Sequence, residues 1–367
     1  MSLRDKLRAQ SAAGRASELF SRFGVLSNPF PSSTHTAHNP HQRLPADDDA
    51  EERIITFLRD GTTQVVVIEG TQGVGKTNFL NFYESEIQDS LADTDGYYVV
   101  RYLADPEASF DGIIRRLFQE LGPAHLKKLT ESLMKDSKPL KTVRGQDMRS
   151  ALQYLVNSKA DQDRIDLMME WLLGFRLLKA HREALGVLFR LDTVESKTAA
   201  LRDLVLVSSA TNVLQGIFLL LDELEKQDGV LGPTAVVRYL SAMRAIIDAL
   251  PRHLFMMIAL TPDAMRRYSA ALPAFRSRFQ NLISLEPLMS SEDAENLADF
   301  YIQTAKSEAK KTQSARAGST NLITRDQIFG VFEQLRKAAE RRGDKGVRQR
   351  EFLHLLHLLA EKSIQAQ

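Results

Sequence analysis

Eight residues, 70–77, carry the strongest chemical signal in the sequence; they read GTQGVGKT and match the spacing G-x-x-x-x-G-K-[ST] at every fixed position. The glycines allow backbone angles closed to other residues, so that successive N–H groups can point at an anion. The lysine supplies a mobile positive charge for phosphates, and the threonine hydroxyl suits Mg²⁺. The spacing predicts a cradle for the phosphates of ATP, formed by Gly70, Gln72, Gly73, Val74, Gly75, Lys76 and Thr77, with Thr77 also a ligand of Mg²⁺.

A pair of acids supplies the second candidate group. The stretch 215–226 reads QGIFLLLDELEK, in which an apolar run ends at Asp222 and Glu223. Parallel strands of an open sheet present their carboxyl ends to the ligand, so these acids are expected near the phosphate loop. Asp222 is predicted to hold Mg²⁺ through water, and Glu223 to polarise the attacking water. Glu225 is expected to be a helix cap or a surface charge.

Two further positions allow alternative interpretations. Thr261 follows the apolar run 254–260, where its hydroxyl would sense the γ-phosphate or hold the water, or simply cap the next helix. Arg276 and Arg278 precede a short strand and either face solvent or reach the nucleotide of a neighbouring subunit as an arginine finger. We take Thr261 and Arg278 as the candidate catalytic residues.

The C-terminal region holds the densest group of basic residues. Arg348, at the start of the last helix, is the candidate to fold over the nucleotide. The remaining bases either contact DNA phosphates or form a solvated face. The basic group comprises Arg336, Lys337, Arg341, Arg342, Lys345, Arg348 and Arg350.

The elements that must position these residues follow from the apolar pattern. Strand-like runs alternate with helical patterns, which predicts an α/β fold with a parallel sheet covered by helices. Residues 123 to about 200 break the alternation and predict a helical insertion. The expected domains are an N-terminal arm and extended linker (1–46), a nucleotide-binding domain (47–288) and a helical C-terminal lid domain (289–367).

Bulk composition narrows the class of protein. The chain has 367 residues with 43% hydrophobic content and a net charge of +1, so any affinity for nucleic acid must come from local patches. There is no cysteine, which excludes disulfides and thiolate metal sites. No apolar run reaches the ~18 residues of a membrane helix, and no signal peptide is recognisable. A cytoplasmic protein is expected.

Some conspicuous residues have a plainer interpretation. His35, His38 and His41 recur at three-residue spacing, but no second group of ligands accompanies them, so solvated loop histidines are favoured over a metal site. Trp171, the only tryptophan, lies in an apolar helical pattern and is expected to anchor packing.

The order of these elements resembles that of the AAA+ ATPases: phosphate loop, helical insertion, LLLDE strand, strand ending in threonine, S-R-F arginine and helical lid. Within that superfamily the chain resembles the initiator-type branch, which includes origin-recognition ATPases and transposition regulators of the TnsC and ExeA-like kind. FGVLSNPF is similar to the F-G-x-x-x-x-P-F entry segment of ExeA-like proteins.

A closer resemblance is to the ATP-binding proteins of BREX-type phage-defence systems. EWLLGFR, EALGV, QGIFLLLDELEK and RQREFLHLLHLL resemble that group's W-x-x-G, L-G-V, G-L-x-x-x-x-D-E and P-R-E-F elements. Gln349 replaces the family's proline before R-E-F, so that Arg350 aligns with the motif while Arg348 fits the helix start; either is then the lid arginine.

The resemblance implies an ATPase that oligomerises with ATP, works with Mg²⁺, and assembles or remodels on DNA beside a partner protein of the same system. The alternative is a STAND-like switch whose nucleotide locks a conformation that recruits another protein, without DNA contact. A small-molecule kinase is disfavoured, because the Asp-Glu pair suits water activation and the long helical regions offer no evident acceptor pocket.

Overall fold

The computed structural model describes residues 19–32, 39–103, 110–224, 233–273, 278–279, 281–311 and 321–365. The fold divides into two compact units built from interleaved stretches of chain. One unit consists of Pro45–Glu69 and Tyr83–Ile283; the other takes the chain before Pro45, the stretch Gly70–Phe82 and the chain from Ser284 onward. We call them the sheet unit and the helical unit.

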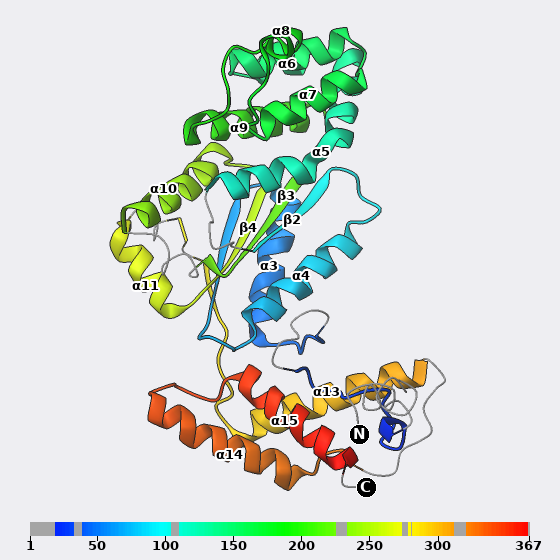
Figure 1. The fold of residues 1–367 in the computed structure, drawn as a ribbon, viewed down its shortest axis with the longest axis vertical. Coiled ribbons are helices and arrows are strands. Elements are labelled where there is room, and N and C mark those ends of the chain that lie inside the picture. The colour runs from blue at the N-terminus through cyan, green and yellow to red at the C-terminus, as the bar shows by residue number, and fades with distance from the viewer. Residues whose placement is uncertain are drawn as a thin grey trace, which may run out of the picture. The chain divides into compact units, whose positions relative to one another are not determined.

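The sheet unit contains a sheet of order β2-β3-β4-β1-β5, formed by β1 (Gln64–Glu69), β2 (Tyr97–Leu103), β3 (Gly216–Asp222), β4 (Leu254–Leu260) and β5 (Asn281–Ser284) (Figure 1). β2, β3, β4 and β1 pair in parallel. Every residue of β3 and β4 is buried, as the unbroken apolar runs require of strands covered on both faces. The predicted α/β class is therefore confirmed.

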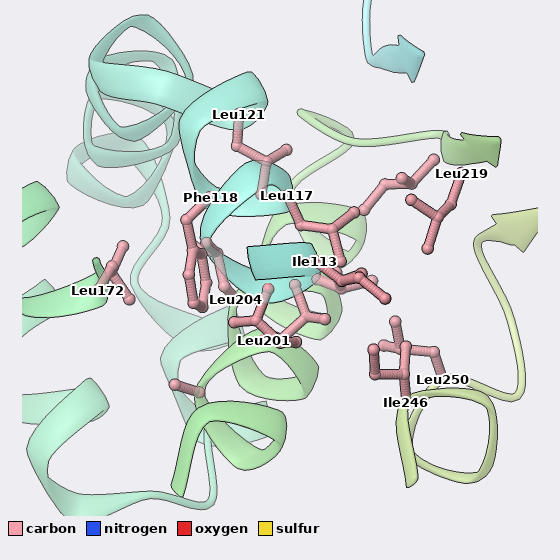
Figure 2. Packing of buried hydrophobic residues seen from close by; sticks show 14 of the residues in the cluster. Ile113, Leu117, Phe118, Leu121, Leu172, Leu201, Leu204, Leu219, Ile246 and Leu250 are labelled. Carbon is pink, nitrogen blue, oxygen red and sulfur yellow. The ribbon is translucent and has the colours of Figure 1, made fainter. Parts of the chain in front are cut away.

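Helices cover both faces of this sheet. Phe57 of α3 (Pro45–Asp60) packs against two phenylalanines of the sheet. Its ring centroid lies 5.1 Å from that of Phe218 and 5.7 Å from that of Phe255. Because side chains alternate along a strand, the intervening residues such as Leu219 face the other side and join α5 (Phe110–Lys135) and α10 (Pro233–Ala249) (Figure 2). α4 (Lys76–Ser90) follows β1, and α11 (Pro262–Ala271) follows β4.

α5 links the sheet to the helical insertion. Ile113, Leu117 and Leu121 of α5 lie with Leu219 of β3, and the same helix meets α9 through Leu201 and Leu204, as Figure 2 shows. A kink interrupts α5 at Gly122, whose φ of 69° is left-handed, and Pro123 begins the second segment. Helices then continue to residue 210 as η1 (Lys138–Thr142), α6 (Gln146–Asn157), α7 (Gln162–Leu172), α8 (Lys179–Leu185) and α9 (Val194–Ala210).

The helical unit has a core of its own. α13 (Ser291–Lys311), α14 (Arg325–Arg342) and α15 (Gln349–Gln365) pack together, and Phe20, Phe23, Val25 and Phe30 of the N-terminal segment join the same cluster. Thr324 caps α14 in a reciprocal capping box with Gln327. The C-terminal helical part expected from the sequence is therefore present. Among the described residues, no helix is both long and apolar enough to cross a membrane.

Candidate functional site: a phosphate loop and an acid-ended strand

The phosphate loop joins the end of β1 to the start of α4. Gly73 and Gly75 have φ values of 83° and 105°, which side chains strongly disfavour. Gly70 is required for space, because a Cβ there would lie 2.6 Å from Val74 Cγ2 and 3.0 Å from the Leu285 carbonyl oxygen. Val74 is buried, Gln72 is exposed, and Thr77 lies in the first turn of α4. The sequence therefore forms a turn whose glycines are needed for two different reasons.

Lys76 lies folded across this loop. Its Nζ donates hydrogen bonds to the carbonyl oxygens of Gly70 at 2.8 Å and Thr71 at 3.3 Å. The ammonium group is thus held over the turn whose backbone the glycines shape. A phosphate would compete with two neutral carbonyls for this charge, and a charged acceptor forms the stronger hydrogen bond.

The start of α15 lies against the same loop, within the helical unit. The Arg350 N–H donates to the Gly73 carbonyl oxygen at 2.9 Å. A Cβ built at Gly73 would lie 3.4 Å from Arg350 Cβ and 3.5 Å from Arg348 Cβ. Arg348 pairs with Asp344 at 3.1 Å and Glu351 at 3.5 Å. Both candidate lid arginines, Arg348 and Arg350, are therefore next to the phosphate loop. The Arg348 side chain is held by its ion pairs with Asp344 and Glu351.

Beside the loop, the helical unit has a shallow hollow that is open to solvent. His41 forms part of its wall and stacks on Phe82, with ring centroids 4.2 Å apart. Asn78 donates to the Pro40 carbonyl oxygen at 3.2 Å, which ties the entering segment to the first turns of α4. The hollow is lined by Pro40, His41, Gln42, Leu44, Val74, Gly75, Asn78, Phe79, Leu285, Leu297, Tyr301 and Gln349.

In the sheet unit, β3 ends at the buried Asp222. Its Oδ2 accepts a hydrogen bond from Arg101 of β2 at 2.9 Å, and its Oδ1 accepts the Glu223 N–H at 2.9 Å. Glu223 has a φ of 56°, an unusual value for a residue with a side chain, which marks a sharp turn directly after the strand. Both carboxylate oxygens of Asp222 are therefore oriented by fixed donors.

Arg101 is the residue of this group that the sequence did not reveal. It lies in β2, and its side chain is only 11% exposed. Glu84 of α4 approaches its Nε at 3.8 Å, and burial raises the pKa of the Glu84 carboxyl group. A single base within the apolar run YYVVRYL was the only available signal, and it has no spacing pattern to mark it as functional.

The remaining candidates occupy separate positions in the sheet unit. The Thr261 hydroxyl accepts the Ala264 N–H at 3.3 Å and so caps α11, the second of its two interpretations. Arg278 donates to Asp248 at 2.9 Å, and its side chain is 46% exposed. Arg276 and Glu225 lie outside the described residues, as do His35 and His38.

The interpretation of Trp171 can be placed directly. Trp171 is buried, and its Nε1 donates to the Phe189 carbonyl oxygen at 2.9 Å, so it packs and braces the insertion. In the part of the chain that the structure describes, no three histidine, aspartate or glutamate side chains gather as a metal-binding group would.

Comparison with known proteins gives a loose similarity of fold. No protein-family model matches the sequence, and no curated protein matches it. The ORC2 protein of Aeropyrum pernix, solved with ADPNP and ADP, matches with a TM-score of 0.45 and 13% identity over 92% of this chain and 72% of that one. The ADP form of the same protein gives a TM-score of 0.44, with 13% identity over 92% and 73% of the two chains.

A third solved structure shows the same degree of similarity. Cdc6p of Pyrobaculum aerophilum matches with a TM-score of 0.40 and 13% identity, over 85% of this chain and 66% of that one. At this identity the comparison assigns no activity to the present chain. What the chain does must be argued from its own residues.

Proposed function

We propose that this protein is a P-loop ATPase of the AAA+ type, which changes state as it binds and hydrolyses ATP. The observation that carries the proposal is the loop itself: Gly73 and Gly75 in left-handed conformations, directly before a helix that begins with Lys76. Backbone amides of such a turn, together with the positive end of a helix dipole, favour a bound polyphosphate. In the proposed ATP complex, Lys76 leaves the carbonyls of its own loop for the β- and γ-phosphates.

The hydrolytic chemistry is assigned to the end of β3. Asp222 and Glu223 lie at the carboxyl end of β3. β1 is parallel to β3 and separated from it by β4, so both strands end on the same side of the sheet. The phosphate loop directly follows β1 in the chain. Glu223 is proposed to accept a proton from the water that attacks the γ-phosphorus, with ADP as the leaving group. Thr77 and Asp222 are the proposed Mg²⁺ residues; the ion would stabilise negative charge on the phosphates.

The hollow beside the loop supports a place for the nucleotide base. The rings of His41, Phe79 and Tyr301 form part of its lining, although Phe79 and Tyr301 are largely buried, and Asn78 and Gln349 add amide groups. Aromatic walls with a few polar groups suit a planar heterocycle. Arg348 is proposed to turn from Asp344 toward the phosphates when ATP is bound, with Arg350 as the other candidate.

On this proposal ATP also controls assembly. Arg278 is exposed enough to reach a neighbouring subunit, where a permanent planar cation would stabilise the charge of the transferring phosphoryl group. Action on or beside DNA, together with a partner protein of a phage-defence or mobile-element system, is the finer proposal and rests on the sequence resemblance to initiator-type and BREX-type ATPases. Thr261 is proposed to sense the γ-phosphate in addition to capping α11.

One observation favours the STAND-like alternative, in which the switch recruits a protein without touching DNA. Acidic neighbours within the helical unit pair with three of the C-terminal bases: Arg336 with Glu333, Arg342 with Glu351, and Arg348 with Asp344. Pairing of this kind lowers the positive potential that DNA phosphates would meet. DNA contact would then rest on exposed bases such as Lys337, Arg341 and Lys345.

Titration of ATP and Mg²⁺ into purified protein, followed by measurement of phosphate release, tests the proposal. Lys76→Ala is expected to abolish ATP binding, because it removes the mobile charge from the phosphate cradle. Glu223→Gln is expected to keep ATP binding and stop hydrolysis, since the amide cannot accept the proton of water. Lys345→Ala, which removes an exposed lysine of the same helical unit, serves as the matched control and should bind and hydrolyse ATP normally.

Sizing of the same samples with and without duplex DNA separates the two candidate functions. Growth of the assembly with an ATP analogue, together with DNA binding that weakens as salt rises, supports the DNA-associated switch, because neutralised phosphates release counterions. ATP binding with no DNA affinity at low salt supports the recruitment switch. Normal ATP binding by Lys76→Ala would remove the loop, and the whole proposal, from consideration.

A further inference from the structure

The helical insertion exposes a compact group of large apolar side chains. Phe175, Leu178, Leu188 and Phe189 are 49%, 68%, 61% and 74% exposed. They come from one short stretch, residues 174–190, which contains α8 between α7 and α9 (Figure 1). We call these four side chains the insertion patch. Solvent exposure on this scale is unfavourable for a group of neighbouring apolar residues unless another surface covers them.

Hydrogen bonds hold the two sides of this stretch together. Arg190 Nε donates to the Gly174 carbonyl oxygen at 2.8 Å, so the residues that follow α8 run beside those that precede it. Arg182 Nη1 donates to the Leu188 carbonyl oxygen at 3.2 Å, and the Leu178 carbonyl oxygen accepts the Arg182 N–H at 3.0 Å. The residues before and after α8 therefore lie close together, and the four exposed side chains come from this one folded stretch.

The same backbone is anchored to the insertion from beneath. Trp171 donates to the Phe189 carbonyl oxygen at 2.9 Å, and the Asp147 carboxylate accepts the Phe189 N–H at 2.9 Å. The neighbours Leu177, Leu185 and Val187 are buried, so the stretch already supplies its own side chains to the core. Leu188 and Phe189 point outward from a fixed backbone, which is the preorganisation that a binding surface needs.

Basic residues outnumber acidic ones in the stretch that carries the patch, although the Asp147 carboxylate also lies at Phe189. Between positions 174 and 190 the only acid is Glu183, and it lies 3.8 Å from Lys179. Exposed bases at the border of the patch are Arg176, Lys179, Arg182 and Arg190. We propose that the insertion patch is a docking site for an acidic amphipathic segment of a partner protein, whose apolar side chains cover the patch and whose carboxylates meet these bases.

The same features disfavour nucleic acid as the occupant. Phe175 and Phe189 offer rings on which a base could stack, but Leu178 and Leu188 are aliphatic and do not. Arg182 and Arg190 use guanidinium N–H groups to hold backbone carbonyls, so their charges sit at fixed points rather than reaching along a phosphate backbone. Fixed cations beside an apolar surface match a peptide with carboxylates at set intervals.

The proposal is tested with a fluorescently labelled synthetic peptide that forms an amphipathic helix. Leucines form one face of this helix and glutamates form the other. Fluorescence anisotropy with the full chain, in the absence of nucleotide, measures binding. Leu188→Ser combined with Phe189→Ser is expected to weaken binding by about tenfold or more, as loss of central apolar contacts does. Arg176→Glu combined with Lys179→Glu is expected to weaken it comparably and to remove its salt dependence.

Controls make the result specific to this surface. Phe329→Ser alters an exposed phenylalanine of α14, 53% exposed, and should leave peptide binding unchanged. All of these substitutions are at exposed positions, and thermal unfolding checks that each variant folds. Lys76→Ala should bind the peptide as the wild type does, so failure of the ATP proposal and failure of this one are distinguishable.

Several outcomes would overturn the docking proposal. These are no binding of the acidic peptide, or equal binding of a matched peptide with lysines in place of the glutamates. Tighter binding of duplex DNA or of phosphatidylglycerol vesicles, lost in the Leu188→Ser and Phe189→Ser variant, would assign the patch to nucleic acid or membrane instead. Self-association that disappears in that variant would assign it to a second copy of this chain.

Discussion

Arg101 and Asp222 form a buried ion pair beside the proposed catalytic glutamate. Their side chains are 11% and 2% exposed, and their closest N and O atoms are 2.9 Å apart. Water cannot solvate either charge once its partner is gone, and this asymmetry dominates the energetics of buried pairs. The pair therefore both orients Asp222 and makes the end of β3 sensitive to substitution in β2.

Arg101→Met is expected to lower the free energy of unfolding by about 3 kcal/mol, because the Asp222 charge is left buried without its partner. The double variant with Asp222→Asn should recover much of that loss, since the buried Asp222 charge is removed as well and only the more exposed Glu84 loses its partner. Urea unfolding measures both. Arg116→Ala on α5, which breaks a partly exposed pair with Glu120 at 3.4 Å, is the control and should cost less than about 1 kcal/mol. A double variant no more stable than Arg101→Met would contradict this account.

His125 makes stability depend on pH. It is buried between Tyr98 and Ser208, with hydrogen bonds of 2.8 Å on each ring nitrogen, and burial, aided by Lys128, lowers its pKa from 6.5 to about 4. The unfolded chain therefore takes up a proton on this histidine at a higher pH than the folded chain does. Its contribution to stability is complete above pH 6.5 and is lost as the pH falls toward 4.

Between pH 6.5 and pH 4, this histidine is expected to lower the free energy of unfolding by about 3 kcal/mol. Denaturant unfolding at a series of pH values should show a steeper fall for the wild type than for His125→Gln, which has no proton to gain. His181→Gln changes a partly exposed histidine of α8 and should keep the wild-type slope. Identical slopes for wild type and His125→Gln would show that the buried ring is not the titrating group.

At residue scale, the sequence predicted those functional residues that form a pattern of fixed local spacing. The order of Gly70, Gly73, Gly75 and Lys76 is a local pattern, and the structure forms the expected turn from it. Arg101 could not be predicted, because its partner follows in the chain only after the whole helical insertion and no local pattern joins them. The roles of Glu223 and Arg278 stay predictions that the proposed kinetic experiments test, and the role of Thr261 also stays a prediction.

Among the elements, strands were the most predictable. β4 occupies the expected residues, 254–260, because a strand buried on both faces must be apolar throughout. The end of the first segment of α5 at Gly122 also follows from local chemistry, since glycine tolerates the left-handed angle and proline suits the next first turn. Docking of α15 on the loop depends on distant side chains and had no local signal.

α14 contains a matched pair of glycines that isolates backbone strain. Gly330 lies inside the helix and Gly343 caps its end with a φ of 73°, and an added Cβ would meet nothing within 4 Å at either position. Gly330→Ala is expected to stabilise by about 0.5–1 kcal/mol through helix propensity, and Gly343→Ala to destabilise by about 1 kcal/mol through the left-handed angle. Thermal unfolding compares them. Shifts of the same sign would rule out this backbone explanation.

On the scale of the whole molecule, the two ends of the chain share one core. Asn28 donates to the His357 carbonyl oxygen and to Glu361 Oε1, both at 3.0 Å, and Phe30 packs on Tyr301 with ring centroids 6.3 Å apart. The sequence suggested consecutive domains, because composition changes along a chain mark only consecutive stretches. Interleaved units need contacts between distant segments, and a single sequence does not contain that information.

Phe30→Ala is expected to destabilise the helical unit by about 3–5 kcal/mol, because it empties a buried site shared by the N-terminal segment and α13. Chemical denaturation with tyrosine fluorescence, which includes Tyr301, follows the transition. Phe329→Ala on exposed α14 surface should change stability by less than about 0.5 kcal/mol. An equally small effect at Phe30 would mean that the N-terminal segment adds no stability.

Assembly is the remaining prediction at this scale, and it rests on the proposed function. If Arg278 acts across a subunit boundary, Arg278→Ala and Glu223→Gln proteins should each be inactive alone yet hydrolyse ATP when mixed, because some interfaces then combine an intact arginine with an intact glutamate. Phosphate release across mixing ratios measures this. Absence of activity at every ratio would confine Arg278 to its ion pair with Asp248.

The position of Arg350 has a consequence for synthesis of the protein. The stretch 70–82 leaves the ribosome before its partner at the start of α15, which lies much further along the chain. Translation proceeds at about 5–20 residues per second, so the start of α15 is made roughly a quarter of a minute to a minute after the phosphate loop. A nascent chain that stops short of α15 would carry a phosphate loop without the contact from Arg350, so competence to bind a nucleotide would signal that α15 had been made.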